Sequence, residues 1–232
     1  MTISARDWRS HPPLIYPGYK STVLRGPTKP LIPLPETLSE RTGPVFGHEC
    51  LAKHDNDLTR NGRVDGAPIG ERIIITGRVM GDDGGPIPDT LLEIWQTNAA
   101  GRYVHVQDLH DAPLDTNFHG AGRCVTDAAG GYRFTSIKPG AYPWSNTANA
   151  WRPAHIHFSL FGPSLATRLV TQMYFPNDPL LAADAIFNAT ADAAARDRLV
   201  AEFSFAATEA GFALGYVFDI VLRGRAATPM ED

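Results

Sequence analysis

The chain has 232 residues, a net charge of -4 at pH 7 and a hydrophobic fraction of 43%. This length fits one large domain with a substantial core, and the absence of a basic stripe argues against nucleic acid as a partner. No apolar run is long enough to cross a membrane and the first residues do not read as a signal peptide, so we expect a cytoplasmic protein without membrane contact.

The N-terminal 45 residues are predicted to form an extended arm. Prolines recur from Pro12 to Pro35, and they forbid long helices and central strands. Aromatic residues in the same stretch, such as Tyr16 and Tyr19, favour an arm that packs on a protein surface over a disordered one. We therefore predict an arm over residues 1–45 that packs on a partner subunit, and a β-sandwich catalytic domain over residues 46–232.

Short strand patterns separated by turn residues begin near residue 70. A β-branched run at 72–80 is followed by a turn rich in Gly and Pro at 81–88. Further strands are predicted at 90–96, 123–126, 132–136, 154–161, 168–174 and 216–223, and a helix at about 191–203. The 21 glycines and 19 prolines are scattered along the chain, as many turns require. The pattern predicts a mainly β fold, a β-sandwich with one or two short helices.

The segment 154–160 alternates strictly between apolar residues and others. Residues two apart on a strand share a face, so Ile156 and Phe158 would pack on a core while His155 and His157 point together to the other side. Two imidazoles on one strand face can chelate one metal ion. The alternative is a solvent-facing strand edge that carries two incidental histidines.

Tyr142 lies shortly before these histidines, between a Pro-Gly turn and another proline. A phenolate is a hard anionic donor that favours Fe(III), whereas the histidines alone leave zinc, copper and iron open. Alone, Tyr142 would be better explained as an aromatic residue packed at a turn. Trp144 and Arg152 fall in the same short stretch, and together these residues predict a non-haem ferric site.

Several longer motifs make the sequence recognisable. The segment from Lys138 to Phe158 is the most specific, and others are Trp95-Gln-Thr-Asn-Ala99, Gly101-Arg-Tyr103, Ala112-Pro-Leu-Asp115 and Phe218-Asp-Ile-Val-Leu-Arg-Gly224. With these motifs, which extend over nearly the whole chain, the sequence resembles the intradiol ring-cleavage dioxygenases. Within that family it is most similar to the β chains of the branch that acts on protocatechuate.

The resemblance implies an Fe(III) ion held by two tyrosines and two histidines. Three of these positions are matched, by Tyr142, His155 and His157. The fourth is a tyrosine before the Ala112-Pro-Leu-Asp115 motif, where this chain has His110, so His110 is predicted as the fourth ligand. In this interpretation Tyr103 has no ligand role. The alternative is that His110 is an unligated loop histidine and that another residue fills the position.

The resemblance also implies a reaction, intradiol cleavage of protocatechuate (3,4-dihydroxybenzoate) by O2 to 3-carboxy-cis,cis-muconate, a step of aromatic catabolism. Tyr142 would leave the iron and accept a substrate proton, and Arg152 would stabilise negative charge on the ring. The residues expected in the substrate pocket are Tyr19, Trp144, Gln172 and Ile186, with Trp95 in its wall. Tyr19 would contact the substrate carboxylate and Gln172 would line the oxygen side.

A homologous α subunit is the partner that the resemblance implies, with the active site at the interface of a hetero-oligomer. Two other functions stay open. One is an intradiol dioxygenase for catechol or hydroxyquinol, but these usually carry an N-terminal helical dimerisation domain where this chain has a Pro-rich arm. The other is a non-catalytic prealbumin-like binding module, which would be colourless because no phenolate would bind ferric iron.

Overall fold

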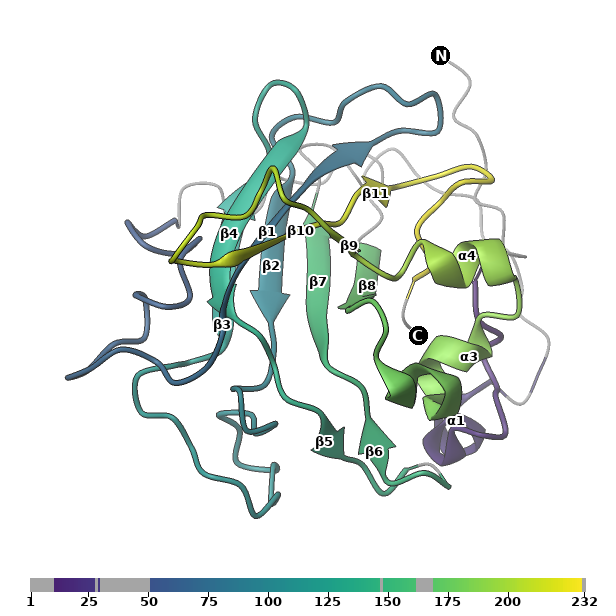
Figure 1. Cartoon of the computed structure of the whole chain (residues 1–232). Helices are drawn as coiled ribbons and strands as arrows, with labels where there is room; N and C mark the ends of the chain where they lie inside the picture. Colours follow the sequence, from purple (N-terminus) through teal and green to yellow (C-terminus); the bar gives the residue numbers. More distant parts are fainter. Residues whose placement is uncertain (1–10, 28, 30–50, 147, 162–168, 231–232) are drawn as a thin grey trace.

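The structure is a computed structural model of the chain, and it describes residues 11–27, 29, 51–146, 148–161 and 169–230. The strands form two main sheets (Figure 1). In the first sheet, β1 pairs with β4 on one side and with β10 and β11 on the other, and β9 pairs with β10. The strands of this sheet are β1 (Arg72–Met80), β4 (Gly131–Ile137), β9 (Glu202–Phe203), β10 (Leu214–Val217) and β11 (Ile220–Val221).

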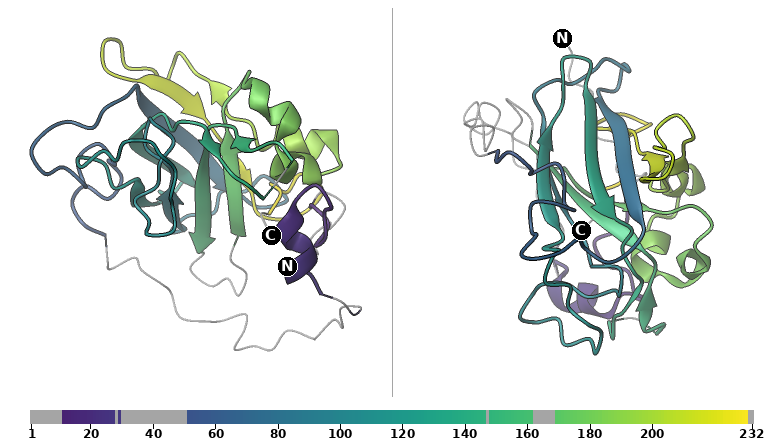
Figure 2. Two further views of the ribbon diagram at one scale, coloured as in Figure 1. Left: turned by 90° about the horizontal axis from the view of Figure 1, so that it is seen from below. Right: turned by 60° about the vertical axis from the view of Figure 1, so that its left-hand side comes forward.

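The second sheet has the order β3-β2-β7-β8 and is antiparallel throughout. Its strands are β2 (Leu91–Trp95), β3 (Ala121–Val125), β7 (His155–Phe161) and β8 (Leu169–Tyr174). Figure 2 shows the two sheets as the two layers of a sandwich. The predicted β-sandwich is therefore confirmed.

The core lies between the sheets. Phe158 of β7 is fully buried, and its ring lies 5.8 Å from that of Phe134 and 6.1 Å from that of Tyr132, both on β4. Phe218 closes the same cluster at 5.3 Å. Through these ring contacts β7 packs on the opposite sheet. Phe158 belongs to the apolar face of β7 that the alternating sequence predicts.

The other face of β7 is buried as well. His155 is 2% exposed and His157 is 8% exposed. β7 pairs with β2 on one side and β8 on the other, so it is an interior strand of its sheet. The alternative of a solvent-facing edge with incidental histidines is therefore wrong.

Three short helices follow β8: η3 (Pro179–Ala183), α3 (Ala185–Ala189) and α4 (Ala193–Asp197). Each begins after an aspartate whose side chain accepts a backbone N–H, as N-cap residues do. The helix predicted over 191–203 is shorter than expected, because Leu199 and Ala201 pair with the backbone of Tyr174 and hold the chain extended there. No helix in the described part of the chain is long and apolar enough to span a membrane.

The described part of the predicted arm contains a helix, α1 (Lys20–Arg25), and it packs on this same chain. The backbone N–H of Lys20 donates to the carbonyl of Asn146, and that of Ser21 donates to the Asn146 side chain. Most of the remaining arm lies outside the described residues. Its contact with a partner subunit, and the division at residue 45, stay predictions.

Cys124 on β3 offers a chemical test of this core. It is 6% exposed, and burial raises the pKa of its thiol to about 12. Because the thiolate is the reactive form, we expect a Cys50→Ser variant, which keeps only this cysteine, to show no labelling by a chromogenic thiol reagent at pH 8 while native. One thiol should appear after denaturation. Rapid labelling of the native variant would contradict the burial of Cys124.

Candidate metal centre

Tyr142 and Arg152 face each other across a small two-stranded sheet. Strand β5 (Tyr142–Pro143) pairs with β6 (Trp151–Arg152), and the register places Tyr142 opposite Arg152. Nη1 of Arg152 lies 3.5 Å from the Tyr142 hydroxyl oxygen and 3.3 Å from Nε2 of His155. Residues that are close in the sequence are therefore also brought together in space.

The two histidines of β7 are oriented by different contacts. Nδ1 of His155 lies 2.7 Å from the carbonyl oxygen of Pro153, which requires Nδ1 to carry the proton and leaves the lone pair on Nε2. The ring of His157 stacks on Trp95 at 4.8 Å, with 5° between the planes. Burial, together with Arg152 and His157, holds the pKa of His155 well below its usual range. His155 is thus a neutral imidazole, the form that binds metals.

Tyr103 completes this group. Its hydroxyl oxygen lies 3.1 Å from Nε2 of His157, and its ring meets that of Tyr142 edge-on at 5.4 Å. The ring centroids of His155 and His157 are 4.9 Å apart, and that of Tyr142 is 5.5 Å from His155. Two phenols and two imidazoles therefore converge on one place.

Glycine at position 101 allows Tyr103 to reach this place. Gly101 has a φ of +80°, and a Cβ atom there would lie 2.1 Å from the carbonyl oxygen of Ala141. The turn before Tyr103 therefore packs directly on the segment that carries Tyr142. The Asn98 carboxamide oxygen accepts the N–H groups of Ala100 and Arg102 and fixes this turn.

The resemblance is interpreted as giving Tyr103 no ligand role. The sequence signal that could have found Tyr103 is Gly101, two residues before it. This glycine permits the left-handed backbone with which the turn packs on the segment that carries Tyr142.

His110, the predicted fourth ligand, lies elsewhere on the same loop. Its ring meets Trp151 edge-on at 6.0 Å, and its backbone N–H donates to the Asp108 carboxylate. Within the described ranges, no three His, Cys, Asp or Glu side chains form a group that could hold a metal ion. His110 lines the same cavity as Tyr103 and Tyr142, and its role as a ligand stays a prediction. Asp108 also accepts the N–H of Tyr103, and so folds the loop with Tyr103 at Tyr142 and His110 at Trp151.

The converging side chains fit a hard trivalent cation. Two tyrosine oxygens are hard donors and two imidazoles supply nitrogen, whereas none of the described residues at this place is a thiol that would favour softer metals. The residues that could hold the ion are Tyr103, Tyr142, His155 and His157.

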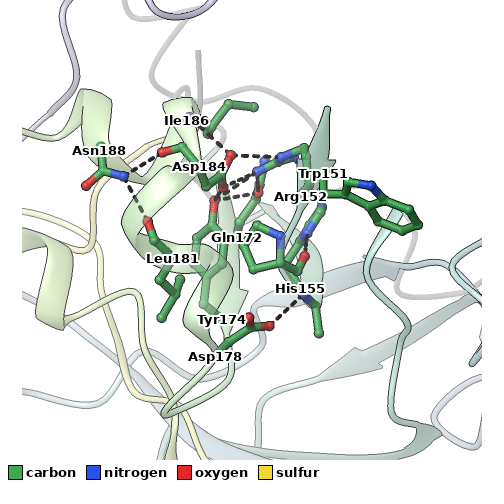
Figure 3. Close-up of polar contacts among 12 residues, drawn as sticks. Trp151, Arg152, His155, Gln172, Tyr174, Asp178, Leu181, Asp184, Ile186 and Asn188 are labelled. Carbon is green, nitrogen blue, oxygen red and sulfur yellow. Dashed lines mark hydrogen bonds and ion pairs between the residues drawn. The ribbon is translucent and has the colours of Figure 1, made fainter. Parts of the chain in front are cut away.

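Arg152 is the centre of a buried polar network (Figure 3). It is 2% exposed, its Nη2 lies 2.7 Å from Oε1 of Gln172 and 3.0 Å from the Tyr174 hydroxyl, and Asp184 binds it from the same side. Burial alone would lower the pKa of Arg152, but Tyr174, Asp184 and Tyr142 outweigh this effect and raise it. A fixed positive charge is thus held beside Tyr142 and His155.

Asp184 and Tyr174 were not predicted from the sequence. Asp178 and Asp192 precede short helices in the same way as Asp184, so the local sequence does not mark which of the three aspartates faces an arginine.

Two cavities adjoin the site. The larger, of about 850 Å³, is lined by residues that include Trp95, Tyr103, Tyr142 and Trp144, and its size suits a small molecule. The residues Tyr19, Gln172 and Ile186 line a separate cavity of about 40 Å³. The predicted pocket residues are therefore divided between two cavities, although the rings of Tyr19 and Trp144 lie 4.8 Å apart and link them.

Comparison with known proteins agrees with the fold. The family model described as Dioxygenase matches residues 41–224, and the model described as Protocatechuate 3,4-dioxygenase beta subunit N terminal matches residues 4–37. The chain is 63% identical over 229 residues to a protocatechuate 3,4-dioxygenase beta chain of Burkholderia cepacia, covering 99% of this chain and 97% of that protein. It is 30% identical to a protocatechuate 3,4-dioxygenase alpha chain of Pseudomonas putida, covering 88% and 99%.

Solved structures show the same similarity. The 3-chlorocatechol 1,2-dioxygenase of Rhodococcus opacus 1CP is 25% identical with a TM-score of 0.55, covering 74% of this chain and 65% of that one. The dioxygenase domain of a carbohydrate-binding fusion protein from Streptomyces sp. SirexAA-E is 26% identical with a TM-score of 0.51, covering 78% and 97%. The chain belongs to the intradiol ring-cleavage dioxygenase family.

Proposed function

We propose that this chain is the iron-binding β chain of an enzyme that cleaves protocatechuate with O2, between its two hydroxylated carbons, to 3-carboxy-cis,cis-muconate. The observation that carries the proposal is the convergence of two phenols and two imidazoles beside a buried arginine. The likeness over nearly the full length to a protocatechuate 3,4-dioxygenase beta chain supports the substrate.

The ligand set that we propose for non-haem Fe(III) is Tyr103, Tyr142, His155 and His157. In this proposal Tyr103 takes the position predicted for His110, because its hydroxyl reaches His157 whereas the His110 ring contacts Trp151. When bound, the ferric ion supplies the Lewis acidity that holds a catechol as its dianion and makes the ring reactive towards O2.

The protein groups around this set have separate roles in the proposal. The phenolate of Tyr142 accepts a substrate proton as a general base. Arg152 keeps its charge 3.5 Å from the Tyr142 oxygen and stabilises negative charge on the ring. Gln172 offers a buried amide nitrogen that has no acceptor among the described residues, and so can donate to a bound oxygen atom.

An acidic substrate is favoured by the arm. The guanidinium of Arg25 donates to the Tyr19 hydroxyl and also lies over the Tyr19 ring, at 5.3 Å from its centroid. Tyr19 in turn contacts Trp144 at the edge of the larger cavity. We propose that Tyr19 and Trp144 bind the substrate at its carboxylate end and that Ile186 shapes the neighbouring wall.

The proposed partner is a homologous α subunit. The identity to an alpha chain over 88% of this chain supports it, since the two kinds of chain share one fold. The interface position of the site and the cytoplasmic location stay predictions.

The test is oxygen uptake by the iron-loaded protein, co-expressed with the α chain. We expect one O2 consumed per protocatechuate and a visible charge-transfer band from the tyrosinates. Activity on plain catechol or hydroxyquinol without activity on protocatechuate would overturn the substrate, and a colourless iron-loaded protein would overturn the ligand set.

A pair of variants separates the two candidates for the fourth ligand. Tyr103→Phe removes only the donor oxygen, so we expect iron occupancy to fall by at least about 10-fold and the visible band to shift, because even partners outside the ligand set cost about 10–100-fold in metal affinity. His110→Ala is expected to keep both the iron content and the band. The measurements are iron per chain and the absorption spectrum, and the reverse pattern would restore His110 as the ligand.

A further inference from the structure

Asp184 binds Arg152 on the side away from Tyr142. Its Oδ1 lies 3.2 Å from Nε of Arg152 and its Oδ2 lies 2.9 Å from Nη2, so the carboxylate engages two nitrogens of one guanidinium. The two side chains are 1–2% exposed, which leaves this ion pair almost without solvent. Figure 3 shows Asp184 and Tyr174 directed at the guanidinium, with Trp151 pointing away from it.

This contact determines which edge of Arg152 faces the candidate metal centre. A guanidinium is planar and its N–H groups form a rigid fork, so fixing Nε and Nη2 also fixes Nη1. Nη1 is the nitrogen that lies beside the Tyr142 hydroxyl and Nε2 of His155. A rotation that broke the pair with Asp184 would move Nη1 from both of them.

Asp184 is itself held rigidly. It is the N-cap residue of α3, where its Oδ1 accepts the backbone N–H of Ile186. Its own backbone N–H donates to Leu180, and its carbonyl accepts both the backbone N–H and the side-chain amide of Asn188. The carboxylate therefore reaches Arg152 from a backbone fixed at both ends.

We propose that Asp184 is a positioning residue for the ring-cleavage reaction: it orients Arg152 so that Nη1 faces the metal centre, and it balances the arginine charge inside the protein. The proposal rests on the proposed function for its kinetic consequence. Tyr174 assists, because its hydroxyl contacts Nη2 of Arg152, Asp184 and Gln172.

The Asp184→Asn variant tests this role. Asparagine has the same size and keeps an oxygen that can cap α3. It loses the negative charge, and its NH2 group replaces one of the two oxygens that accept N–H groups from the guanidinium. We expect full iron content, a kcat about 10–100-fold lower, a smaller change in KM for protocatechuate and a shifted charge-transfer band, as for loss of a group that orients the site.

Asp192→Asn is the matched control. Asp192 caps α4 with the same geometry, accepting the N–H of Ala194 at 3.0 Å, and it is exposed. The control therefore removes an N-cap carboxylate without touching Arg152. Wild-type kcat and spectrum are expected, and an equal loss in both variants would show that capping alone explains the effect.

A second measurement does not depend on iron or activity. In the iron-free protein, the Nε–H of Arg152 should exchange slowly with solvent in the wild type and in Asp192→Asn, and faster in Asp184→Asn, as followed by NMR. If Asp184→Asn fails to fold, Asp184→Glu keeps the charge and is expected to show the same changes in milder form.

These results separate the two proposals. Wild-type kcat, band and exchange in Asp184→Asn would overturn the role of Asp184. Absence of oxygen uptake by the wild type with protocatechuate would instead overturn the proposed function, and the exchange measurement would still decide whether Asp184 positions Arg152.

Discussion

Replacement of Arg152 by methionine is expected to lower kcat/KM for protocatechuate by about 10²–10³-fold, the loss typical of removing one group that stabilises developing negative charge. The same change should lower the free energy of unfolding by about 3–5 kcal/mol, because it leaves the Asp184 carboxylate buried without its cation. Oxygen uptake measures the first effect and chemical denaturation measures the second.

The double variant Arg152→Met/Asp184→Leu separates these effects. Replacing both members of a buried ion pair by apolar residues is often neutral for stability, so the unfolding free energy should return to near the wild-type value. Activity should stay low, because the positive charge is still missing. Normal turnover in Arg152→Met would remove this arginine from the reaction, and unchanged stability would show that Asp184 is solvated when unpaired.

Truncation of Phe158 to alanine is expected to lower the free energy of unfolding by about 3–5 kcal/mol, since the change opens a cavity among the rings of Tyr132, Phe134 and Phe218. Phe158 is fully buried and follows His157 directly on β7. We therefore also expect weaker iron binding, because relaxation into the cavity shifts the strand that carries both histidines. Urea denaturation and iron titration are the measurements.

Phe205→Ala is the control for this prediction. The Phe205 side chain is 86% exposed, so its truncation should change stability by less than about 0.5 kcal/mol. A loss in Phe158→Ala no larger than that in the control would mean that the packing of the two sheets contributes little to the stability of β7.

The sequence predicted the parts of this protein that depend on short-range patterns. The period of two in 154–160 gave β7 and the shared face of His155 and His157, and the short spacing of Tyr142 and Arg152 gave neighbours that β5 and β6 then pair. The fold class followed in the same way, from strand patterns and turn residues.

Tyr103 and Asp184 could not be found in this way, because their roles depend on tertiary contacts. Tyr103 reaches His157 only because Gly101 lets one turn pack on the carbonyl of Ala141. Asp184 is one of several aspartates before short helices, and only the packing of η3, which ends at Asp184, beside β6 makes it the partner of Arg152. The end of the last helix was missed for the same reason, since β8 holds the following residues extended.

The four proposed donor side chains are Tyr142 on β5, two histidines on β7 and Tyr103 on a loop, and the fold holds them in different ways. The histidines belong to an interior strand, whereas Tyr103 follows a turn that depends on the left-handed backbone of Gly101. Local opening of such a turn requires far less free energy than unfolding of the sheet. Metal exchange should therefore proceed by release of the tyrosine turn from an intact sandwich, and its rate should respond to changes in the turn that leave global stability untouched.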